Sequence, residues 1–463
     1  MTDGIIQIDQ ELCTACKRCG DNCPVDAIEG EQGKPQTVCE ERCVNCGQCI
    51  QICSAYDSIF DDNLTPRATR LRERSLFPSL KEPLFAVYDR NCLADVKAAL
   101  ADAGLFTMVQ CDSTVSSAIP EDFGLAAGSL SPGQVAASLK KLGFQKAYNT
   151  NSLAAFSILE EAHELIERLN CGRVLPVIDS SCPAAVKFIE QSYPELIHYL
   201  SSCKSPHQVA GALFKSYGAK RSGIDPASVY SVSVVPCTSR KFEANRPEMK
   251  ADDQEGRREV DAVLTTRELA YLIKDAGIDI FGLPPEEFDK DLADIPWLAN
   301  VYCTTGDVTQ AVLHTSPELL TNGARSPLNI AFADAQTEGA RVTSVRVDQY
   351  DIKAVAVSGL RNAIPFLEAI KAGKREFGFM EIRACPMGCV SGGGQPKVLL
   401  PQDKLPAYIE RANLTSFCSA GDRNKISEHA AVQQVYQGYF KKPYGDKSNR
   451  ILHTQYAERR LGH

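Results

Sequence analysis

Two runs of cysteines near the start of this 463-residue chain have the spacing that metal chemistry requires. The first run reads C-x2-C-x2-C-x3-C and is followed by Pro24, and the second run, CVNCGQCIQIC, repeats that spacing. Bacterial electron carriers with two [4Fe–4S] clusters use this run, in which three close thiolates hold one cluster and the fourth thiolate holds the other. The spacing therefore predicts two clusters with crossed ligands.

The crossed pattern assigns four thiolates to each cluster. The first cluster takes Cys13, Cys16, Cys19 and Cys53. The second cluster takes Cys43, Cys46, Cys49 and Cys23. Two structural zinc sites are the alternative, but zinc patterns normally pair two short C-x2-C elements across a longer gap. We therefore predict a small α+β ferredoxin-like domain with two [4Fe–4S] clusters over residues 1–60.

Four further cysteines are dispersed along the chain. They are Cys182 in DSSCPAA, Cys237 in VVPCTSRKFE, and Cys385 with Cys389 in ACPMGCVSGGGQP. Three apolar runs that are typical of buried strands, VLPVID, VYSVSVV and FGFMEI, lead directly into these segments. Because the carboxyl ends of parallel strands meet at one edge of a sheet, we predict that the four thiolates share one buried iron–sulfur centre.

After residue 84, the predicted elements that position these cysteines alternate between strands and helices. Residues 61–83 hold several prolines and basic residues, which indicates an irregular linker. Beyond it, strand candidates such as LFAVYD, DAVLTT and IKAVAVSG alternate with helix candidates such as ILEEAHELIERL, AAVKFIEQSY, SPHQVAGALFKSY and TRELAYLIKDAG. Strands that alternate with helices predict an α/β domain over residues 84–463 with largely parallel sheets.

Charge and hydropathy exclude some classes of partner. The formal charge of −8 and the lack of a basic stripe tell against a nucleic-acid partner. Residues 1–60 carry ten Asp and Glu against four Lys and Arg, so this stretch is the acidic part of the chain. No run of eighteen apolar residues and no signal-peptide pattern occur, so we expect no membrane span and a cytoplasmic protein with reduced thiols.

The dispersed motifs make the resemblance specific. The chain resembles the [FeFe]-hydrogenases, whose TSCCPxW loop stands here as residues 179–185 and whose MPCxxKxxE loop stands as residues 235–243. The family's ACxxGCxxGGGQP loop is complete from Ala384 to Pro396. Similarity continues through YPELIHYLSSCKSP, DAVLTTREL and a small-subunit-like tail with ISEHAAVQQVYQGYF and ILHTQY, so it covers nearly the whole chain.

This resemblance implies a catalytic domain of two lobes around parallel or mixed sheets that holds an H-cluster. The cluster would comprise a [4Fe–4S] cubane on Cys182, Cys237, Cys385 and Cys389 and a diiron subsite with CO, cyanide and azadithiolate ligands. The implied reaction is 2H⁺ + 2e⁻ ⇌ H₂, with electrons passing through the two ferredoxin-type clusters. The implied partners are H₂, protons, a ferredoxin or another redox protein, and maturation proteins that install the diiron subsite.

The resemblance also implies a proton relay. Its members by position are Glu161, Glu164, Arg168 and Ser201, and the usual terminal cysteine is replaced by Ser181. A thiol has a pKa near ~8.5, whereas an aliphatic hydroxyl is far less acidic and must donate and accept a proton nearly in concert. We therefore expect slow or rerouted proton transfer. Cys203 and Cys171 stand nearby in sequence, and an inert buried cysteine is the simpler interpretation of each.

Other pocket positions depart from the family pattern. Arg240 stands in place of a lysine that usually donates to a cyanide ligand, whereas Glu243 is retained. Val235 and Arg383 replace methionines, and His207 stands where glutamine is common. Because Arg and Lys differ in size and in donor geometry, these changes predict a divergent subgroup with an altered pocket.

Two classes of function follow from the resemblance. The first is a hydrogenase enzyme. The second is a relative without that activity, either an H₂ sensor or an iron–sulfur assembly protein that keeps the cubane ligands but lacks the diiron site. The eight N-terminal cysteines, Glu243 and the GGGQP segment favour the enzyme because they suit a diiron pocket and an electron chain.

Overall fold

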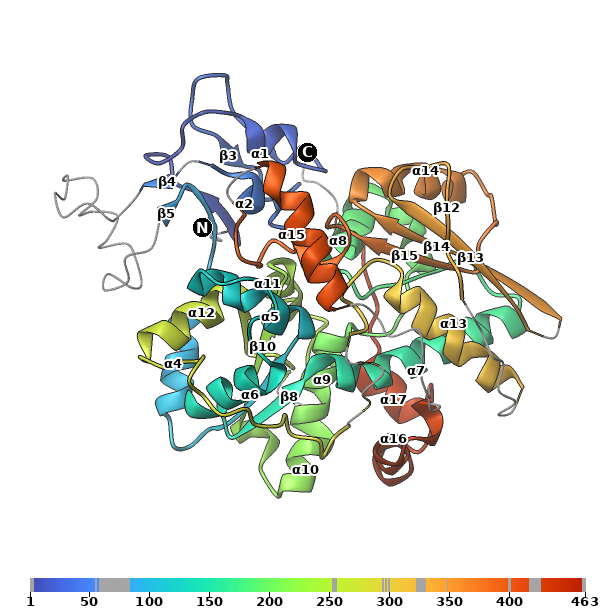
Figure 1. Cartoon of the computed structure of the whole chain (residues 1–463). Coiled ribbons are helices and arrows are strands. Elements are labelled where there is room, and N and C mark those ends of the chain that lie inside the picture. Colours follow the sequence, from blue (N-terminus) through green and yellow to red (C-terminus); the bar gives the residue numbers. More distant parts are fainter. Residues whose placement is uncertain are drawn as a thin grey trace.

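The structure is a computed structural model of the whole chain, shown in Figure 1. It describes residues 4–54, 56–57, 84–251, 256–293, 295, 298, 300–321, 330–347, 349–398, 401–415 and 426–459. The linker predicted at residues 61–83 lies outside the described residues. Within the described part of the chain, no helix is long and apolar enough to cross a membrane.

The N-terminal region is built from short strands and two short helices around the first eight cysteines. Its elements are β1 (Ile6–Ile8), α1 (Arg18–Asp21), β2 (Ile28–Glu29), β3 (Thr37–Val38), α2 (Gln48–Ile52) and β4 (Tyr56–Asp57). Strands β2 and β3 form an antiparallel pair. The mixture of short strands and helices matches the predicted α+β class.

Residues 84–89 pair with this N-terminal region. Strand β5 (Leu84–Phe85) is antiparallel to β4, and β6 (Val87–Asp89) is antiparallel to β1. The run LFAVYD was expected to open the second domain as one buried strand, but it is divided between two ladders of the first. We therefore propose that the second domain begins after Asp89 rather than at residue 84.

A four-stranded parallel sheet forms one lobe of the second domain, in the order β11-β10-β7-β8. Its strands are β7 (Phe106–Cys111), β8 (Lys146–Asn149), β10 (Val229–Val235) and β11 (Ala262–Thr265). A five-stranded mixed sheet forms the other lobe, in the order β12-β13-β14-β15-β9. Its strands are β9 (Val177–Ile178), β12 (Ala333–Asp334), β13 (Ala340–Val347), β14 (Tyr350–Ser358) and β15 (Phe379–Arg383).

Helices cover both sheets and join the two lobes. They are α4 (Leu93–Ala101), α5 (Ser113–Ala118), α6 (Pro132–Lys141), α7 (Thr150–Asn170), α8 (Pro183–Ser192), α9 (Pro206–Leu213), α10 (Ala219–Ser222), α11 (Ser239–Ala244), α12 (Thr266–Asp275), α13 (Asp307–Leu320), α14 (Leu360–Lys371), α15 (Pro401–Leu414), α16 (Ala430–Val435) and α17 (Asp446–Leu452). One hydrophobic core contains residues of α7, α9 and α13 together with residues of both sheets. The two lobes therefore share a core between them.

The predicted helices and the other five predicted strands are present. The run ILEEAHELIERL lies inside α7, which begins with Asn149 as its cap: the Asn149 side chain accepts hydrogen bonds from the backbone N–H groups of Asn151 and Ser152. TRELAYLIKDAG forms α12 behind a capping box made by Thr265 and Glu268. In the view of Figure 1, α15 lies beside the N-terminal region and α16 and α17 lie near α7.

Candidate metal centres and proton route

The first predicted quartet lines one small cavity. Cys13, Cys16, Cys19 and Cys53 all border it. Burial, with smaller contributions from the thiols of Cys53, Cys13 and Cys16, raises the pKa of Cys19 to about 11. A cationic iron cluster would reverse this penalty on the Cys19 thiolate. The crossed partner Cys53 therefore lies with the first run, at the expected place.

The second predicted quartet lines a separate small cavity. Cys23, Cys43, Cys46 and Cys49 border it. Backbone amides already point at two of its sulfurs, with the N–H of Ala27 3.2 Å from Cys23 Sγ and the N–H of Asn45 3.4 Å from Cys43 Sγ. Asn45 and Gly47 both have positive φ, which lets the short loop turn around the cavity.

Among the described residues, no group of three or more His, Cys, Asp or Glu side chains is arranged to hold a single metal ion. The preference for [4Fe–4S] clusters over zinc at the two quartets rests on the cysteine spacing, which repeats a triple-cysteine run instead of pairing two C-x2-C elements.

The four dispersed cysteines gather at the ends of the expected strands. Cys182 follows β9 and caps α8, Cys237 lies between β10 and α11, Cys385 follows β15, and Cys389 begins a short 3-10 turn. Burial raises the pKa of Cys237 to about 11, and the Cys182 thiol adds to this rise. Burial also raises the pKa of Cys385, with contributions from Cys237, Cys182 and Cys389. The four thiols therefore share one buried site.

The second quartet lies next to this site. The Cys46 thiol contributes to the raised pKa of Cys385, and Cys237 contributes in turn to that of Cys46. The two regions touch through glycine backbones: a Cβ added to Gly393 would lie 2.5 Å from both Cys46 O and Gly47 Cα. Hence the Gly392–Gly394 run allows a close backbone approach to the N-terminal region.

Side-chain hydrogen bonds reinforce this contact. The hydroxyl of Thr238 donates to Asn45 O at 2.6 Å, and that of Ser239 donates to Val44 O at 3.0 Å. The buried amide of Gln51 donates to Gln395 O at 2.8 Å. The loop that carries Cys237 and the loop that follows Cys389 are thus both bonded to the segment that carries the second quartet.

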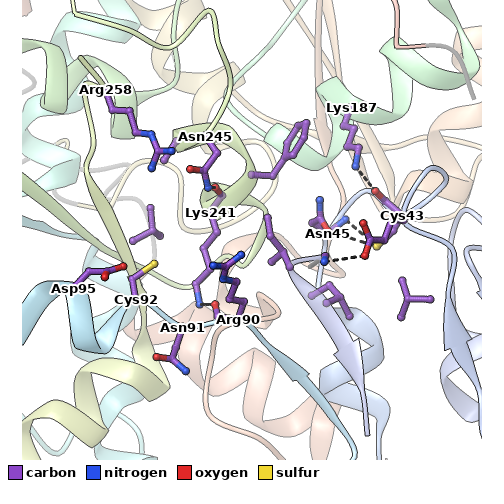
Figure 2. A pocket seen from close by; sticks show the side chains of 18 of the residues that line it. Cys43, Asn45, Arg90, Asn91, Cys92, Asp95, Lys187, Lys241, Asn245 and Arg258 are labelled. Atoms are coloured by element: carbon purple, nitrogen blue, oxygen red, sulfur yellow. Dashed lines mark hydrogen bonds between the residues drawn. The ribbon is translucent and has the colours of Figure 1, made fainter. Parts of the chain in front are cut away.

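A wide cavity lies elsewhere on this interface. It has a volume of about 750 Å³, and of the twelve predicted ligands only Cys43 borders it. Figure 2 shows Lys187 reaching the Cys43 carbonyl, where its Nζ donates at 2.6 Å. Lys241 points into the middle of the view and is held by Asp89 and Glu268 at 2.6 Å each. The cavity therefore borders the second quartet but not the dispersed cysteines.

Two buried guanidinium groups lie beside the dispersed thiols. Arg240 donates to Glu243 Oε2 at 2.7 Å and to Ser181 O at 2.8 Å. Arg383 donates from Nε to Glu381 Oε1 at 2.9 Å and from Nη1 to Ser181 Oγ at 2.6 Å. Although desolvation opposes it, the pKa of Arg383 is raised by Glu381 and Asp179, with Cys389 and Cys182 adding to the rise. Both positions predicted to line the pocket therefore bring positive charge to it.

Unused donors at this site fit the group that the resemblance implies. Among the described residues, Arg383 Nη2 and His207 Nε2 are buried without a hydrogen-bond partner. His207 is held from its other side, with Nδ1 2.6 Å from Ser233 Oγ, and burial lowers its pKa, so the ring is neutral. Nε2 is a donor in the tautomer in which Nδ1 accepts from the Ser233 hydroxyl. A cluster with cyanide and CO ligands offers acceptors to such donors, and buried polar groups in native proteins are rarely left unpaired.

Ser181 is held on both sides by charged groups. Its hydroxyl donates to Asp179 Oδ2 at 2.7 Å and accepts from Arg383. Its backbone N–H donates to Asp179 Oδ1 at 2.9 Å. Arg383 Nη2 also lies 3.5 Å from Asp179 Oδ2. These contacts prevent free rotation of the Ser181 hydroxyl and direct its proton toward the Asp179 carboxylate.

The four other relay residues form a connected set. Arg168 pairs with Glu164 Oε1 at 2.5 Å, and Ser201 Oγ donates to Glu164 Oε2 at 2.9 Å. The Ser201 hydroxyl also interacts with Glu161, whose pKa is raised well above its usual value by burial, Asp179 and Glu164. Arg168 lies at the partly exposed end, and Glu161 is 3% exposed. The set thus leads from near the surface toward Asp179.

The two cysteines near the relay differ in setting. Cys203 is buried, its thiol lies 3.3 Å from Lys204 O, and burial raises its pKa, with Glu161 next in effect. Cys171 is exposed at the end of α7. Val235, another predicted pocket residue, is buried at the last position of β10, two residues before Cys237.

Sequence reasoning missed two carboxylates of this site. Asp179 stands in the motif at a threonine position, so the quoted loop already held a signal that a charge enters the pocket. Glu381, two residues before Arg383 on β15, accepts from the backbone N–H groups of Gly306 and Thr309 at 2.9 Å each. Its only signal was a charged residue inside the apolar strand FGFMEI, and the two backbone groups that it accepts from lie more than seventy residues away.

Family models match most of the chain. The model described as "Iron only hydrogenase large subunit, C-terminal domain" matches residues 106–393. The models "Iron hydrogenase small subunit" and "4Fe-4S binding domain" match residues 426–459 and 6–29.

Individual proteins are similar over most of their lengths. The periplasmic [Fe] hydrogenase large subunit of Nitratidesulfovibrio vulgaris is 36% identical over 414 residues, which cover 89% of each chain. Iron hydrogenase 1 of Clostridium pasteurianum is 31% identical over 94% of this chain and 78% of its own. Cytosolic iron-sulfur assembly component 3 of Mus musculus is 30% identical over 68% of this chain and 67% of its own. The structure of [FeFe]-hydrogenase HydA1 from Chlamydomonas reinhardtii superimposes with a TM-score of 0.71 at 30% identity, covering 80% of this chain and 100% of that one.

Proposed function

This chain is an iron hydrogenase of the [FeFe] family with a ferredoxin-like N-terminal domain, and we propose that it catalyses 2H⁺ + 2e⁻ ⇌ H₂ at an H-cluster. The cubane of that cluster would be held by Cys182, Cys237, Cys385 and Cys389. When bound, the diiron part of the cluster supplies an open iron position for H₂.

The observation that carries this proposal is the pair of unused donors beside the four thiols. Arg383 Nη2 and His207 Nε2 are buried and have no hydrogen-bond partner among the described residues, although Asp179 Oδ2 and Glu243 Oε2 lie 3.5 Å and 3.9 Å from them, respectively. A lone cubane gives them no acceptor beyond its sulfurs, whereas cyanide and CO ligands do. Arg240 and Val235 complete the proposed lining, with Arg240 fixed by Glu243.

Electrons are proposed to travel in a line through three cubanes. Cys16 is exposed, so the first quartet is the one nearer solvent. The second quartet is coupled through Cys46 to Cys237 and Cys385. The acidic residues of the N-terminal region would meet a redox partner with a basic face, such as a ferredoxin-type protein or an enzyme subunit.

Protons are proposed to use the set Arg168, Glu164, Ser201 and Glu161, with Ser181 at the inner end. The pKa of Glu161 is raised by burial, Asp179 and Glu164, which favours the protonated carboxyl that a relay needs as a proton carrier. Dedicated maturation proteins would be needed to install the diiron part. The predicted compartment is the cytoplasm, because the nineteen cysteines must remain reduced.

A second candidate function is supported by the assembly-component relatives. The cytosolic iron-sulfur assembly component 3 of Mus musculus is 30% identical over 334 residues. A scaffold of that kind would keep cubanes on the same thiolates and would need no diiron subsite. An H₂ sensor is a third candidate function. Such a protein would hold the complete H-cluster but would evolve or consume little H₂.

Infrared spectroscopy with an H₂ assay on the same sample separates these functions. The protein is matured without oxygen together with the maturation proteins of a known hydrogenase, and an unmatured sample serves as control. The proposal predicts CO and cyanide bands and measurable H₂ evolution. Cubanes without those bands after maturation would support the scaffold, and bands with negligible turnover would support the sensor.

A further inference from the structure

A carboxylate lies at the inner end of the proton route, at a position where the family motif has threonine. Asp179 follows β9 and is 1% exposed. It lies three residues before Cys182, so its backbone is held by the same loop that carries a proposed ligand. A buried carboxylate is costly unless it is paired or takes up a proton, so its presence here requires a reason.

Asp179 is bonded to Ser181 and is in electrostatic contact with the relay. Both of its oxygens accept from Ser181, at 2.7 Å from the hydroxyl and at 2.9 Å from the backbone N–H. Its charge is the main reason, after burial, that the pKa of Glu161 is raised. Glu161 Oε1 is buried and has no hydrogen-bond partner among the described residues. The Glu161 carboxyl, one oxygen of which has no hydrogen-bond partner among the described residues, is therefore within electrostatic range of the carboxylate that holds Ser181.

Charged groups face Asp179 from each element around it. Arg383 on β15 lies 3.5 Å from Oδ2, and Glu381 on the same strand opposes ionisation. Glu161 comes from α7, and the buried Tyr302 lies within electrostatic range. Burial and Glu381 outweigh the cation, so the pKa of Asp179 is raised. Arg383 thus pairs with the carboxyl groups of both Asp179 and Glu381. A proton can therefore be shared among the carboxyl groups of this site.

We infer that Asp179 takes over the ionisable role of the missing relay thiol and passes protons between Glu161 and the Ser181 hydroxyl. This inference rests on the proposed hydrogenase function. Asp179 acts through Ser181 and is therefore a positioning residue of the relay. The step between the two carboxyls requires a bridging water molecule or a turn of the Glu161 side chain.

The hydrogen-bond capacity of Ser181 supports this step. A hydroxyl has one donor and two acceptor lone pairs. With Asp179 ionised, the donor points at Asp179 and Arg383 occupies one lone pair. When Glu161 gives up its proton and Asp179 binds it, Asp179 becomes the donor and fills the second lone pair. The proton of Ser181 then passes to an acceptor in the pocket, such as a water molecule, while Oγ receives the proton of Asp179. Bonds to hydrogen break at Glu161, Asp179 and Ser181, and bonds to hydrogen form at Asp179, Ser181 and that acceptor.

A double-mutant cycle tests the inference. We expect Asp179→Asn, which keeps an acceptor oxygen but cannot ionise, to lower H₂ evolution at least about tenfold, because positioned proton donors contribute about 10²- to 10⁴-fold. In the Ser181→Cys background, where the thiol is ionisable, the same change is expected to cost less than about twofold. A purely structural role would give equal losses in both backgrounds and would overturn the inference. Asp179→Thr, the residue of the family motif, replaces Asn if that variant fails to fold.

A second measurement does not depend on turnover. In the unmatured protein, infrared difference spectra between two pH values in H₂O and D₂O should contain a carboxylic-acid band that Asp179→Asn abolishes. Asp112→Asn is the matched control, because Asp112 is also buried and caps α5 through Thr114 but does not bond Ser181. An unchanged spectrum in Asp179→Asn would overturn the inference even if the proposed activity is absent. Wild-type H₂ evolution with no effect of Asp179→Asn would overturn it while leaving the proposed function intact.

Discussion

At the residue scale, position 181 differs from the family pattern in more than the loss of a thiol, because residues that contact it differ as well. The hydroxyl of Ser181 is bound between Asp179 and Arg383, and the carbonyl of Ser181 accepts from Arg240. Two of these partners, Asp179 and Arg383, are themselves departures from the family pattern. The side chains of Ser181, Asp179 and Arg383 satisfy one another's hydrogen-bonding groups. The serine therefore stands together with two further departures from the family pattern.

Ser181→Cys tests the importance of the terminal group alone. We expect the variant to evolve H₂ faster by about tenfold or more, because a thiol with a pKa near ~8.5 exchanges protons without a concerted partner. The assay is H₂ evolution per loaded diiron site, with loading taken from the infrared bands. Ser180→Cys is the control, since the Ser180 hydroxyl donates to Cys203 O and not to the relay. A fully loaded Ser181→Cys that is no faster than wild type would contradict the prediction.

At the scale of elements, the glycine run after Cys389 determines how closely the two domains approach. The backbone of Gly393 touches that of Gly47, and the φ of Gly47 is +72°. Side chains cannot be accommodated there because the opposing atoms are backbone atoms, which have no rotamer to adjust. The segment therefore sets the distance between the second quartet and the dispersed cysteines.

Gly393→Ala should move the N-terminal region away from the catalytic domain. The added Cβ would lie 2.5 Å from Cys46 O, so one backbone must shift. We expect slower electron transfer between the second cubane and the buried cubane, together with a weaker magnetic interaction in the electron paramagnetic resonance spectrum. Gly438→Ala is the control, since no heavy atom lies within 4 Å of its Cβ. Unchanged transfer and spectra in Gly393→Ala would show that the contact is not required.

The start of α13 carries a buried acid that should affect stability. Burial raises the pKa of Asp307 to about 7, with Thr304 donating to it, Glu381 opposing its ionisation and Arg383 favouring it. A raised carboxyl pKa stabilises the fold at low pH, and this contribution is lost as the pH rises from the usual value of 3.8 through 7.

Asp307→Asn should remove this pH dependence. In the wild type, the shift of about three units corresponds to a loss of at most about 4 kcal/mol of unfolding free energy between pH 4 and pH 8. Urea unfolding of the unmatured protein at several pH values measures it. We expect a flatter profile in Asp307→Asn and greater stability than wild type at pH 8. An equal slope in both proteins would assign the pH dependence to other groups.

At the scale of the whole molecule, the three proposed cluster sites follow one another from the N-terminal region into the catalytic domain. The crossed quartets link the two cysteine runs to each other, and the glycine contact links the second quartet to the catalytic domain. Strands β5 and β6 return to the N-terminal region before the chain enters the catalytic domain. The N-terminal region is thus attached by strand pairing as well as by the linker.

Cys53→Ser tests the crossed ligands. Although Cys53 belongs to the second run, it lines the cavity of Cys13, Cys16 and Cys19. We expect the variant to lose or convert the cluster of the first run, leaving about eight of about twelve iron ions in the unmatured protein. Iron analysis and electron paramagnetic resonance measure this, and Cys39→Ser, outside both quartets, is the control. Loss of the cluster near Cys46 instead would contradict the crossing.

The sequence by itself determined the local parts of this protein. Cysteine spacing predicted both N-terminal quartets because ligands within a few residues of one another are constrained by the short loop that carries them. Apolar periodicity predicted α7, α8, α12 and the strands that lead to the dispersed cysteines, because burial of one face repeats along the chain. The motif loops identified Ser181, Arg240 and Arg383 as departures without indicating what they contact.

Only the tertiary structure decided which groups meet. The partners of Ser181 come from the end of β9 and from β15, two hundred residues apart, and their hydrogen bonds depend on side-chain directions that no spacing encodes. The contact between Gly393 and Gly47 and the pairing of β6 with β1 join segments that are equally remote. LFAVYD is divided between two ladders because strand pairing depends on which remote strands lie beside the run, and the run itself does not encode this. The sequence thus predicted the metal ligands, and the fold brought the predicted ligands and relay residues together.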